Sequence, residues 1–255
     1  WLLAEFGWRE TLQVFAGISV LIAPLAWLVV RNTPGDVGQT VDGLALEAKS
    51  EETQSRPEAL NVGKILRSRN FWALALAMGI IFGLGGGWNA NAPRFGEDLG
   101  YSGQYMSSLI GIAAGLGIPS TLLFGMLADR FDNRRLLWFA IVGQAMSFLL
   151  LWTQPPGALF GGAILLFGFA GGGLLPVYAS FIGRLFGPAS FGSVMGLAGL
   201  VGLPFGASAP IVAGVIRDRS GSYEDALLTF AVAFLISAVV LMWIRTDPRS
   251  SRKPT

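Results

Sequence analysis

The sequence contains no cysteine and no histidine among its 255 residues, and only 13% of its residues are charged. A thiolate or imidazole metal site, a Ser/His/Asp triad and a cysteine nucleophile are therefore excluded within this chain. No other catalytic cluster is visible. We predict that the chain is not an enzyme and that it binds no metal and no cofactor.

The few charged residues are confined to short islands between long uncharged runs. These runs cover residues 11–30, 70–93, 99–128, 136–183, 185–216 and 226–244. A helix needs about 20 mostly apolar residues to cross roughly 30 Å of hydrocarbon, and only helices or closed barrels satisfy their own backbone hydrogen bonds there. The 48-residue run contains Gln-Pro-Pro-Gly at 154–157, which divides it into two spans. The pattern predicts an all-α membrane protein.

Seven spans follow, at 11–30, 71–92, 104–128, 136–153, 158–182, 190–216 and 226–244. The first is not a signal peptide, since no basic region precedes it and no small-residue cleavage site follows it. Because the chain starts at Trp1 and its first span starts outside, we interpret it as a fragment without its true N-terminus. We divide it into a first transmembrane helix (1–31), a hydrophilic linker (32–70), a six-helix block (71–245) and a tail (246–255).

Lysine and arginine predict the orientation. If the first span starts outside, the inside segments hold 14 of the 18 basic residues and the outside segments hold 4. The positive-inside rule selects this arrangement, with the linker and C-terminus cytoplasmic in the cell (inner) membrane. The same topology accounts for the net charge of +2 without a nucleic-acid partner.

The linker is polar and rich in turn-forming residues, so we predict no packed core within it. Its end, from Leu60 through Arg69, is expected to form a short amphipathic helix on the membrane surface. Leu60, Ile65 and Leu66 would lie on one side of that helix.

A charged motif follows the third span, with G-M-L-A-D-R at 125–130 and two further arginines. It resembles the G-x-L-A-D-R-x-G-R-R loop of major facilitator superfamily transporters, with Asp132 where a glycine is usual. Gly-Trp-Arg at 7–9, the long linker and the six helices resemble that family's sixth helix, central loop and C-terminal bundle. The resemblance implies seven spans of that fold, a lipid bilayer around them and a missing N-terminal six-helix half as packing partner.

The motif's charges would lie at the inner mouth, where charge pairs and helix dipoles can latch helix ends together in one state only. Alternating access needs such a bistable contact. The alternative, that the arginines only mark topology, stays open. The predicted gating loop consists of Gly125, Asp129, Arg130, Arg134 and Arg135.

A narrower resemblance lies near the C-terminus. The stretch G-R-L-F-G at 183–187, the glycines at 192, 196 and 214, and D-R-S-G-S-Y at 218–223 followed by Ala226 are similar to the monocarboxylate porter and oxalate/formate antiporter branch. Members of that branch commonly carry an arginine four residues before the loop glycine, where it can face a carboxylate. Here Thr121 occupies that position, and threonine is no electrostatic substitute for arginine. A monocarboxylate substrate is weakened by this departure but not excluded.

Glycine is abundant, with 35 residues. Glycines four apart let helix backbones approach closely, and three in succession weaken a helix. The triplets at 85–87 and 171–173, together with prolines in the spans, therefore predict hinges or broken helices. The spaced pairs are Gly79 and Gly83, Gly111 and Gly115, Gly168 and Gly172, Gly192 and Gly196, and Gly202 and Gly206.

No Asp, Glu, Lys or Arg lies deep within a predicted span, although such a charge would be the default functional residue. Proton coupling would therefore use the missing half or the boundary cluster Arg94, Glu97 and Asp98. We interpret Gln144 as interhelical hydrogen bonding. Trp88 and Tyr105 could alternatively be interfacial belt aromatics. The predicted substrate-binding residues, with Asn91 and Tyr178 ranked first, are Trp88, Asn89, Asn91, Tyr105, Thr121, Tyr178 and Ser208.

These features predict a secondary active transporter of small organic solutes, monocarboxylate-like anions in particular, that works by alternating access. Symport and antiport are both open, and a proton is a candidate co-transported ion. One alternative is a porter for efflux of drugs or other solutes. Another is a membrane solute sensor or scaffold that does not transport.

Overall fold

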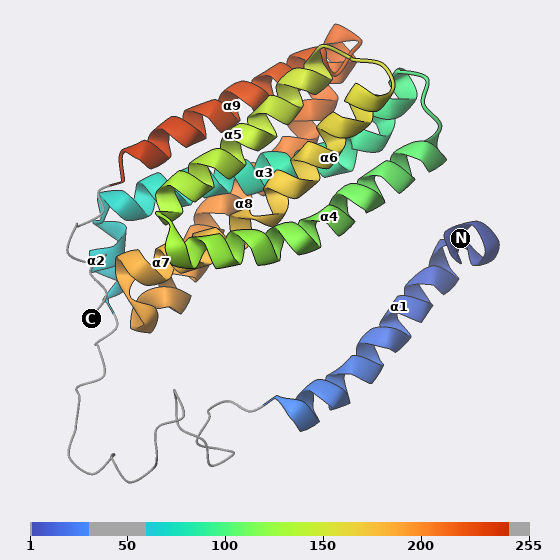
Figure 1. The fold of residues 1–255 in the computed structure, drawn as a ribbon. Coiled ribbons are helices and arrows are strands. Elements are labelled where there is room, and N and C mark those ends of the chain that lie inside the picture. The colour runs from blue at the N-terminus through green and yellow to red at the C-terminus, as the bar shows by residue number, and fades with distance from the viewer. Residues whose placement is uncertain (1, 31–59, 245–255) are drawn as a thin grey trace, which may run out of the picture. The chain divides into compact units, whose positions relative to one another are not determined.

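The computed structural model describes residues 2–30 and 60–244, and every regular element within them is a helix (Figure 1). The chain divides into two compact units, residues 1–55 and 56–255. The predictions for most of the linker, residues 32–59, and for the tail at 246–255 lie outside the described residues.

The first unit contains one helix, α1 (Leu2–Val29). Gly7 interrupts its regular backbone with φ +83° and ψ 174°, a conformation open to glycine and strained for other residues. The hydroxyl of Thr11, one helical turn after Gly7, donates to the Gly7 carbonyl at 2.7 Å. The membrane-spanning stretch is Glu5–Val29, which begins earlier than the predicted 11–30.

The second unit is a bundle of long helices that run side by side (Figure 1). Six further stretches of membrane-spanning length lie in it, so the predicted total of seven spans is confirmed. The last span, Glu224–Met242, has the predicted length of 19 residues, and the other spans are longer than predicted because their helices continue beyond the predicted ends. In chain order the elements are α2 (Val62–Leu66), α3 (Arg69–Asp98), α4 (Gly103–Arg130), α5 (Asn133–Trp152), α6 (Ala158–Gly172), α7 (Leu174–Phe186), the 3-10 turn η4 (Pro188–Ser190), α8 (Phe191–Ser220) and α9 (Glu224–Met242).

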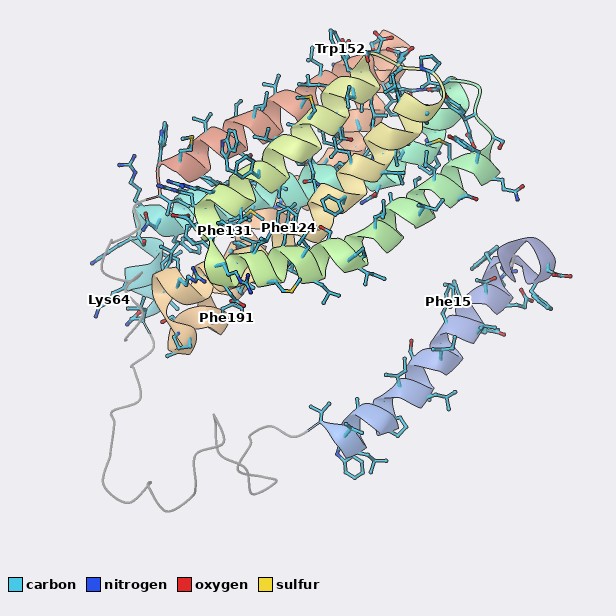
Figure 2. The ribbon with its side chains drawn as sticks, viewed as in Figure 1. Phe15, Lys64, Phe124, Phe131, Trp152 and Phe191 are labelled. Carbon is cyan, nitrogen blue, oxygen red and sulfur yellow. The ribbon has the colours of Figure 1, made fainter. Side chains whose placement is uncertain are left out.

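The alternating direction of the helices gathers the loops at two ends of the bundle. Lys64, Phe131 and Phe191 lie at one end, and Trp152 lies at the other (Figure 2). The described parts of the segments predicted to be cytoplasmic, at 60–69, 129–135 and 183–189, therefore share one end. Which side of the membrane that end faces stays a prediction from the positive-inside rule.

Side-chain caps begin three of the spans. Ser68 accepts from the Phe71 amide at the start of α3, and Ser102 accepts from the Tyr105 amide at the start of α4. Asp132 caps α5 through the amides that follow it, those of Arg134 and Arg135. Aspartate is a strong N-cap residue, so the departure from glycine in the loop motif supplies a helix start.

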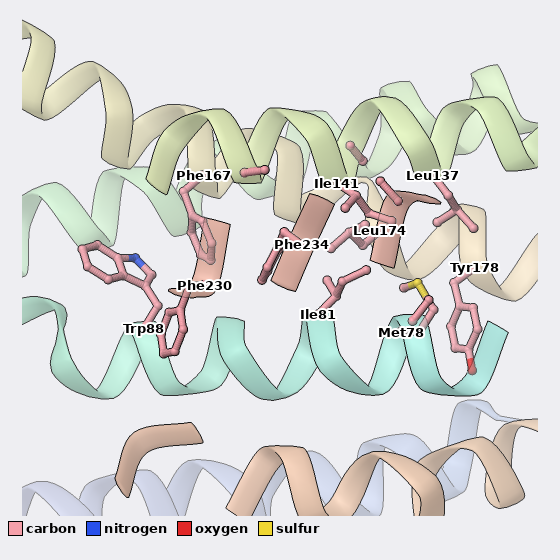
Figure 3. Packing of buried hydrophobic residues seen from close by; sticks show 14 of the residues in the cluster. Met78, Ile81, Trp88, Leu137, Ile141, Phe167, Leu174, Tyr178, Phe230 and Phe234 are labelled. Atoms are coloured by element: carbon pink, nitrogen blue, oxygen red, sulfur yellow. The ribbon is translucent and has the colours of Figure 1, made fainter. Parts of the chain in front are cut away.

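Aromatic side chains fill the bundle core between α3, α5, α6 and α9 (Figure 3). The ring of Phe148 lies at its centre, 5.3 Å from that of Phe234 and 5.7 Å from those of Phe230 and Trp88. Most of these pairs meet edge to face, the geometry that aromatic quadrupoles favour. Because lipid provides no hydrophobic drive between helices, such close packing carries much of their association.

Glycines bring α3 and α8 into backbone contact. A Cβ at Gly83 would lie 2.6 Å from the backbone carbon of Phe205, and one at Gly87 would lie 2.8 Å from Ala209 Cβ. Gly79 meets Gly202 in the same way, with 3.0 Å between a Cβ at Gly79 and the Gly202 Cα. Only residues without a side chain permit this approach.

The pair Gly168 and Gly172 has the same role between α6 and α4, where the two glycines lie against Ala113 and Gly117. The pairs at 79/83 and 168/172 are thus confirmed as packing surfaces. Gly202 contacts Gly79, and the remaining spaced glycines have a different environment. Within the described part of the chain, a Cβ would meet nothing within 4 Å at Gly111, Gly115, Gly192, Gly196 or Gly206.

The two glycine triplets behave differently. The fifth span is interrupted for one residue at the second triplet, since α6 ends at Gly172 and α7 begins at Leu174, while Gly173 between them keeps right-handed helical angles of φ −77° and ψ −17°. A Cβ at Gly173 would collide with the ring of Phe124, so the break is also a point of close approach. The prediction of a break at 85–87 is wrong, because α3 continues through these residues.

Candidate solute-binding cavities

Two neighbouring cavities of the second unit share Phe82 on α3, which lines both of them. The first cavity, about 490 Å³, lies between α3, α4, α5 and α6. Its wall consists of Ile81, Phe82, Gly85, Gly86, Trp88, Asn89, Ile110, Ala113, Ala114, Gly117, Gln144, Ile164, Phe167, Gly168, Gly171, Gly172 and Leu174. The second cavity, about 450 Å³, lies between α3, α7 and α8, with Met78, Gly79, Gly83, Leu175, Tyr178, Met195, Ala198, Gly199, Gly202, Leu203, Gly206 and Ala207 on its wall.

The first cavity contains two of the predicted substrate-binding residues, Trp88 and Asn89. Trp88 is buried among core aromatics, whereas Asn89 is exposed. A third polar residue, Gln144, reaches the cavity from α5. Among the described residues that line it, none is Asp, Glu, Lys or Arg, so the wall combines apolar surface with uncharged hydrogen-bonding groups.

The second cavity contains Tyr178, one of the two residues ranked first. Its ring lies edge-on to Phe82, with 6.1 Å between the ring centroids. Two methionines, Met78 and Met195, face the same space. This cavity is more apolar than the first, and its wall suits aliphatic or aromatic parts of a solute.

Asn91, the other residue ranked first, lies in a helix interface and not on a cavity wall. Its Nδ2 atom donates to Gly87 O at 2.9 Å and to Pro210 O at 3.3 Å. Its Oδ1 atom accepts from the Tyr223 hydroxyl at 3.2 Å. Protein groups therefore occupy both ends of the amide, and the arrangement favours a packing role over solute binding.

Ser208 and Tyr105 also lie outside the two cavity walls. The Ser208 hydroxyl donates to Pro204 O of its own helix at 2.7 Å. Tyr105 lies in the first turn of α4 and stacks on Tyr101, with 5.3 Å between ring centroids. A position at a span end is the one that the belt-aromatic alternative for Tyr105 predicts.

Thr121 on α4 forms a hydrogen bond with the fifth span where α6 ends. Its hydroxyl lies 2.8 Å from Gly117 O and 2.8 Å from Gly172 O. Pro176 has no N–H, so it cannot donate to the carbonyl four residues earlier, which belongs to Gly172. The single proton of the threonine hydroxyl is shared between that carbonyl and Gly117 O. The Pro176 spacing predicts an unpaired carbonyl at Gly172, but the sequence gives no indication that Thr121 pairs with it.

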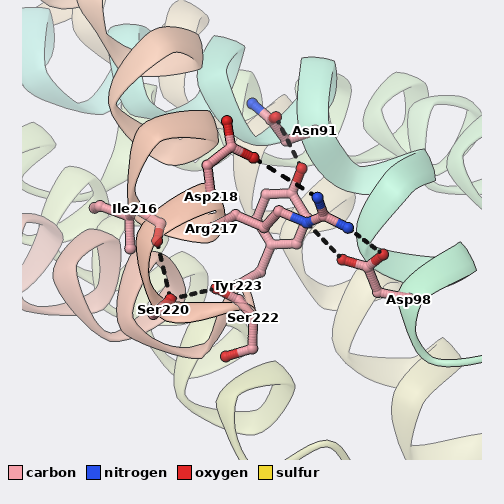
Figure 4. Close-up of polar contacts among 8 residues, drawn as sticks. All are labelled: Asn91, Asp98, Ile216, Arg217, Asp218, Ser220, Ser222 and Tyr223. Atoms are coloured by element: carbon pink, nitrogen blue, oxygen red, sulfur yellow. Dashed lines mark hydrogen bonds and ion pairs between the residues drawn. The ribbon is translucent and has the colours of Figure 1, made fainter.

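A polar network joins α3 to α8 at the end of the bundle opposite the loop motif (Figure 4). Arg217 binds Asp98 with two bonds, Nη2 to Oδ1 at 2.9 Å and Nε to Oδ2 at 3.1 Å. Asp218 lies 3.7 Å from the same guanidinium group. Of the predicted boundary cluster, Asp98 is thus the member that forms an ion pair within the described residues.

The turn between α8 and α9 positions Tyr223 beside this network (Figure 4). Gly221 ends α8 in a left-handed conformation, with φ +80°, and Ser220 Oγ donates to Ser222 O at 2.9 Å. Burial raises the pKa of the Tyr223 phenol above its usual value, although the nearby Arg217 charge acts in the opposite direction. The phenol therefore stays protonated and donates to Asn91. These contacts give the S-G-S-Y segment a local structural role.

At the other end, the predicted gating loop makes backbone contacts. Arg134 Nη1 donates to Ile244 O at 3.1 Å, which connects the start of α5 to the end of α9. Arg184 of α7 donates to Ala128 O at 2.5 Å. Within residues 2–30 and 60–244, no ion pair of Asp129, Arg130 or Arg135 is found, so the latch stays a prediction. Gly125 lies in the last two turns of α4.

Seven apolar spans, six of them in one bundle that contains glycine contacts and uncharged cavities, define an integral multi-pass membrane protein. The sequence profile described as Major Facilitator Superfamily matches residues 1–209 and, in a second match, residues 120–255. The chain belongs to this superfamily. The family match agrees with the predicted all-α membrane fold.

Individual relatives carry the names of transport proteins. The chain is 26% identical over 254 residues to the cis,cis-muconate transport protein of Acinetobacter baylyi, covering 94% of this chain and 57% of that protein. It is 27% identical over 263 residues to the cyanate transport protein CynX of Escherichia coli, covering 94% and 64%. It is 30% identical over 139 residues to human monocarboxylate transporter 10, covering 53% and 26%. These names agree with the prediction that the chain is not an enzyme.

Proposed function

We propose that this chain is part of a secondary active transporter that moves small organic solutes by alternating access. The observation that carries the proposal is the first cavity, which lies beside the broken fifth span and joins apolar walls to Asn89 and Gln144. Cavities of roughly 300–1,000 Å³ with a few convergent polar groups are typical of small-molecule sites. Interrupted helices at membrane depth are typical of transporter binding sites. The chain spans 57% of the muconate transport protein, so transport is proposed for the complete protein.

Small carboxylates are the proposed solute class. The names of the muconate and monocarboxylate relatives support this choice. Since no basic side chain lines either cavity among the described residues, we propose that the N-terminal six-helix half supplies the cation that faces the carboxylate. The exposed apolar faces of α4 and α8, with Ile118 and Leu203 among their side chains, support that half as a neighbour of this bundle.

Efflux of drugs or similar apolar solutes is the second candidate. The observation in its favour is the second cavity, whose wall offers Tyr178, Phe82 and two methionines but no charge. Aromatic and thioether groups bind varied apolar ligands without strict geometry. The two candidates differ in the solute that is moved, and the same mechanism serves both.

The contacts between α3 and α8 and the interruption of the fifth span support a division into units that move. The bidentate Arg217–Asp98 pair and the glycine contacts fasten α3 to α8. The break at Gly173 lies on a different span and separates α6 from α7. We propose that α3 and α8 move together while the angle between α6 and α7 changes.

The test is uptake and counterflow of labelled cis,cis-muconate, lactate and cyanate in proteoliposomes of the complete protein, with and without a pH gradient. We expect saturable carboxylate flux that falls several-fold in the variant Asn89→Leu. Ser237→Ala is the matched control, because Ser237 is buried in α9 and bonds only to its own helix. Carboxylate flux that is absent, with export of apolar dyes present, would favour the efflux candidate. Absence of both would favour the sensor alternative.

A further inference from the structure

Gln144 contains a buried hydrogen-bond acceptor without a donor. The side chain is 3% exposed, and its Oε1 atom has no hydrogen-bond partner within the described part of the chain. The Nε2 atom donates to Phe167 O at 3.4 Å. Because a carbonyl oxygen faces one end of the amide, the nitrogen belongs at that end and the oxygen is the free atom. An unsatisfied buried acceptor is unfavourable, so a partner from outside the chain is expected.

The surroundings of Gln144 give its amide room at the cavity. Gly171 faces it across the wall, and a Cβ at Gly171 would lie 2.9 Å from Nε2. Both residues line the first cavity. The glycine therefore leaves space for the amide, and a larger residue would push it away from its present position.

Ser147, three residues further along α5, forms an ordinary hydrogen bond between helices and serves as a comparison for Gln144. It is also buried, and its hydroxyl donates to Ala163 O at 2.6 Å. That one bond uses the only proton of the hydroxyl, and Ser147 does not line the first cavity. Gln144 also donates one hydrogen bond to α6, but its acceptor atom Oε1 has no donor among the described residues. The interpretation of Gln144 as interhelical hydrogen bonding therefore accounts for half of its amide.

Oε1 has almost no accessible surface in this conformation, so we propose that the Gln144 amide turns into the first cavity, where Oε1 binds an uncharged donor, a hydroxyl or amide N–H, of a solute. This inference deepens the proposed function and rests on it. No ionised side chain lines this cavity among the described residues, so a charged donor would lose its hydration without gaining a counter-ion. A neutral donor meets the acceptor without that cost. Trp88 and Phe167, on the same wall, pack against the apolar part of the solute.

The proposal selects hydroxylated or amide-bearing carboxylates over their plain analogues. A site that offers a buried partner to a donor rejects the analogue without that donor, because its own group is then left unpaired. The matched probes are 2-hydroxypropanoate and propanoate, which differ by one hydroxyl. A second pair, mandelate and phenylacetate, tests the same difference on an aromatic frame.

The experiment compares wild type with Gln144→Leu in the complete protein. We expect wild type to prefer the hydroxylated probe and Gln144→Leu to lose about tenfold of that preference, the change that one hydrogen bond typically gives. The readout is the ratio of the two fluxes, because a residue on the cavity wall can also change the flux of each probe by itself. Gly171→Ala is a second variant, which displaces the amide without removing it and should lower the same ratio. Ser147→Ala is the matched control, with reduced thermal stability and an unchanged ratio.

Two readings separate this inference from the proposed function. Uptake into proteoliposomes measures transport, and the shift of the thermal unfolding midpoint in detergent measures binding of the same probes. Flux with an unchanged ratio in Gln144→Leu, or equal loss for both probes, overturns the role of Gln144 but not transport. A hydroxyl-dependent midpoint shift that Gln144→Leu abolishes, without any flux, supports the binding role and contradicts transport. Absence of flux and of midpoint shifts in wild type overturns both.

Discussion

The contact between α3 and α8 gives the sharpest stability prediction. In the variant Gly83→Ala, the new Cβ would lie 2.6 Å from both the backbone carbon and the Cβ of Phe205. That distance is about 1 Å short of the 3.5–4.0 Å optimum for two carbon atoms. Because one of the two atoms is backbone, no rotation of the Phe205 side chain relieves the overlap. The helices must separate, and every contact along their interface weakens.

The size of the effect follows from two terms. Overpacking of a close-packed interior costs about 1–3 kcal/mol. Replacing glycine by alanine inside a helix contributes about 1 kcal/mol in the opposite direction. Gly86→Ala has the same helix-propensity gain on the same helix, but its Cβ would meet nothing within 4 Å. The difference between the two variants therefore isolates the overpacking term.

The assay is the thermal unfolding midpoint of the complete protein in detergent. For a domain of 150–250 residues, 1 kcal/mol corresponds to about 2–4 °C, so Gly83→Ala should unfold roughly 2–12 °C below Gly86→Ala. Adding Phe205→Ala should not restore the loss, since the backbone atom remains in place. Equal midpoints for the two glycine variants would show that α3 and α8 are not in contact at Gly83, and the reasoning would be wrong.

Two further predictions concern hydrogen bonds. Thr121→Val removes the hydroxyl that donates to the Gly172 and Gly117 carbonyls and should lower stability by about 0.5–1.5 kcal/mol, whereas Thr121→Ser should behave as wild type in the same thermal assay; equal stability of all three would contradict the assigned bond. Tyr223→Phe removes the donor to Asn91 and should also lower the unfolding midpoint at neutral pH. Burial raises the folded-state pKa of Tyr223 above its usual value of about 10, so its contribution is present below pH 10 and is lost as pH rises through the folded-state pKa. Wild type should therefore lose more stability than Tyr223→Phe between pH 9 and 12, and parallel curves would refute the assignment.

The sequence predicts the seven spans because hydropathy is a property of consecutive residues. A run such as 226–244 is long enough and apolar enough to cross a membrane whatever its neighbours are. The loop motif and the order of the spans were likewise sufficient to identify the superfamily that the profile match confirms. The small-residue spacing at 79/83 indicated a packing face in the same local way.

The roles of individual polar residues depended on the tertiary structure. Asn91 and Asn89 are two residues apart on one helix, yet the first lies against α8 and the second lines a cavity. Thr121 pairs with a carbonyl 51 residues away, and Gln144 meets α6 with only one end of its amide. The rotation of each helix about its axis decides which side chains face a neighbour and which face a cavity. That rotation is set by the packing of all the helices together, so the sequence determined which segments span the membrane, and only the tertiary structure decided what their polar groups meet.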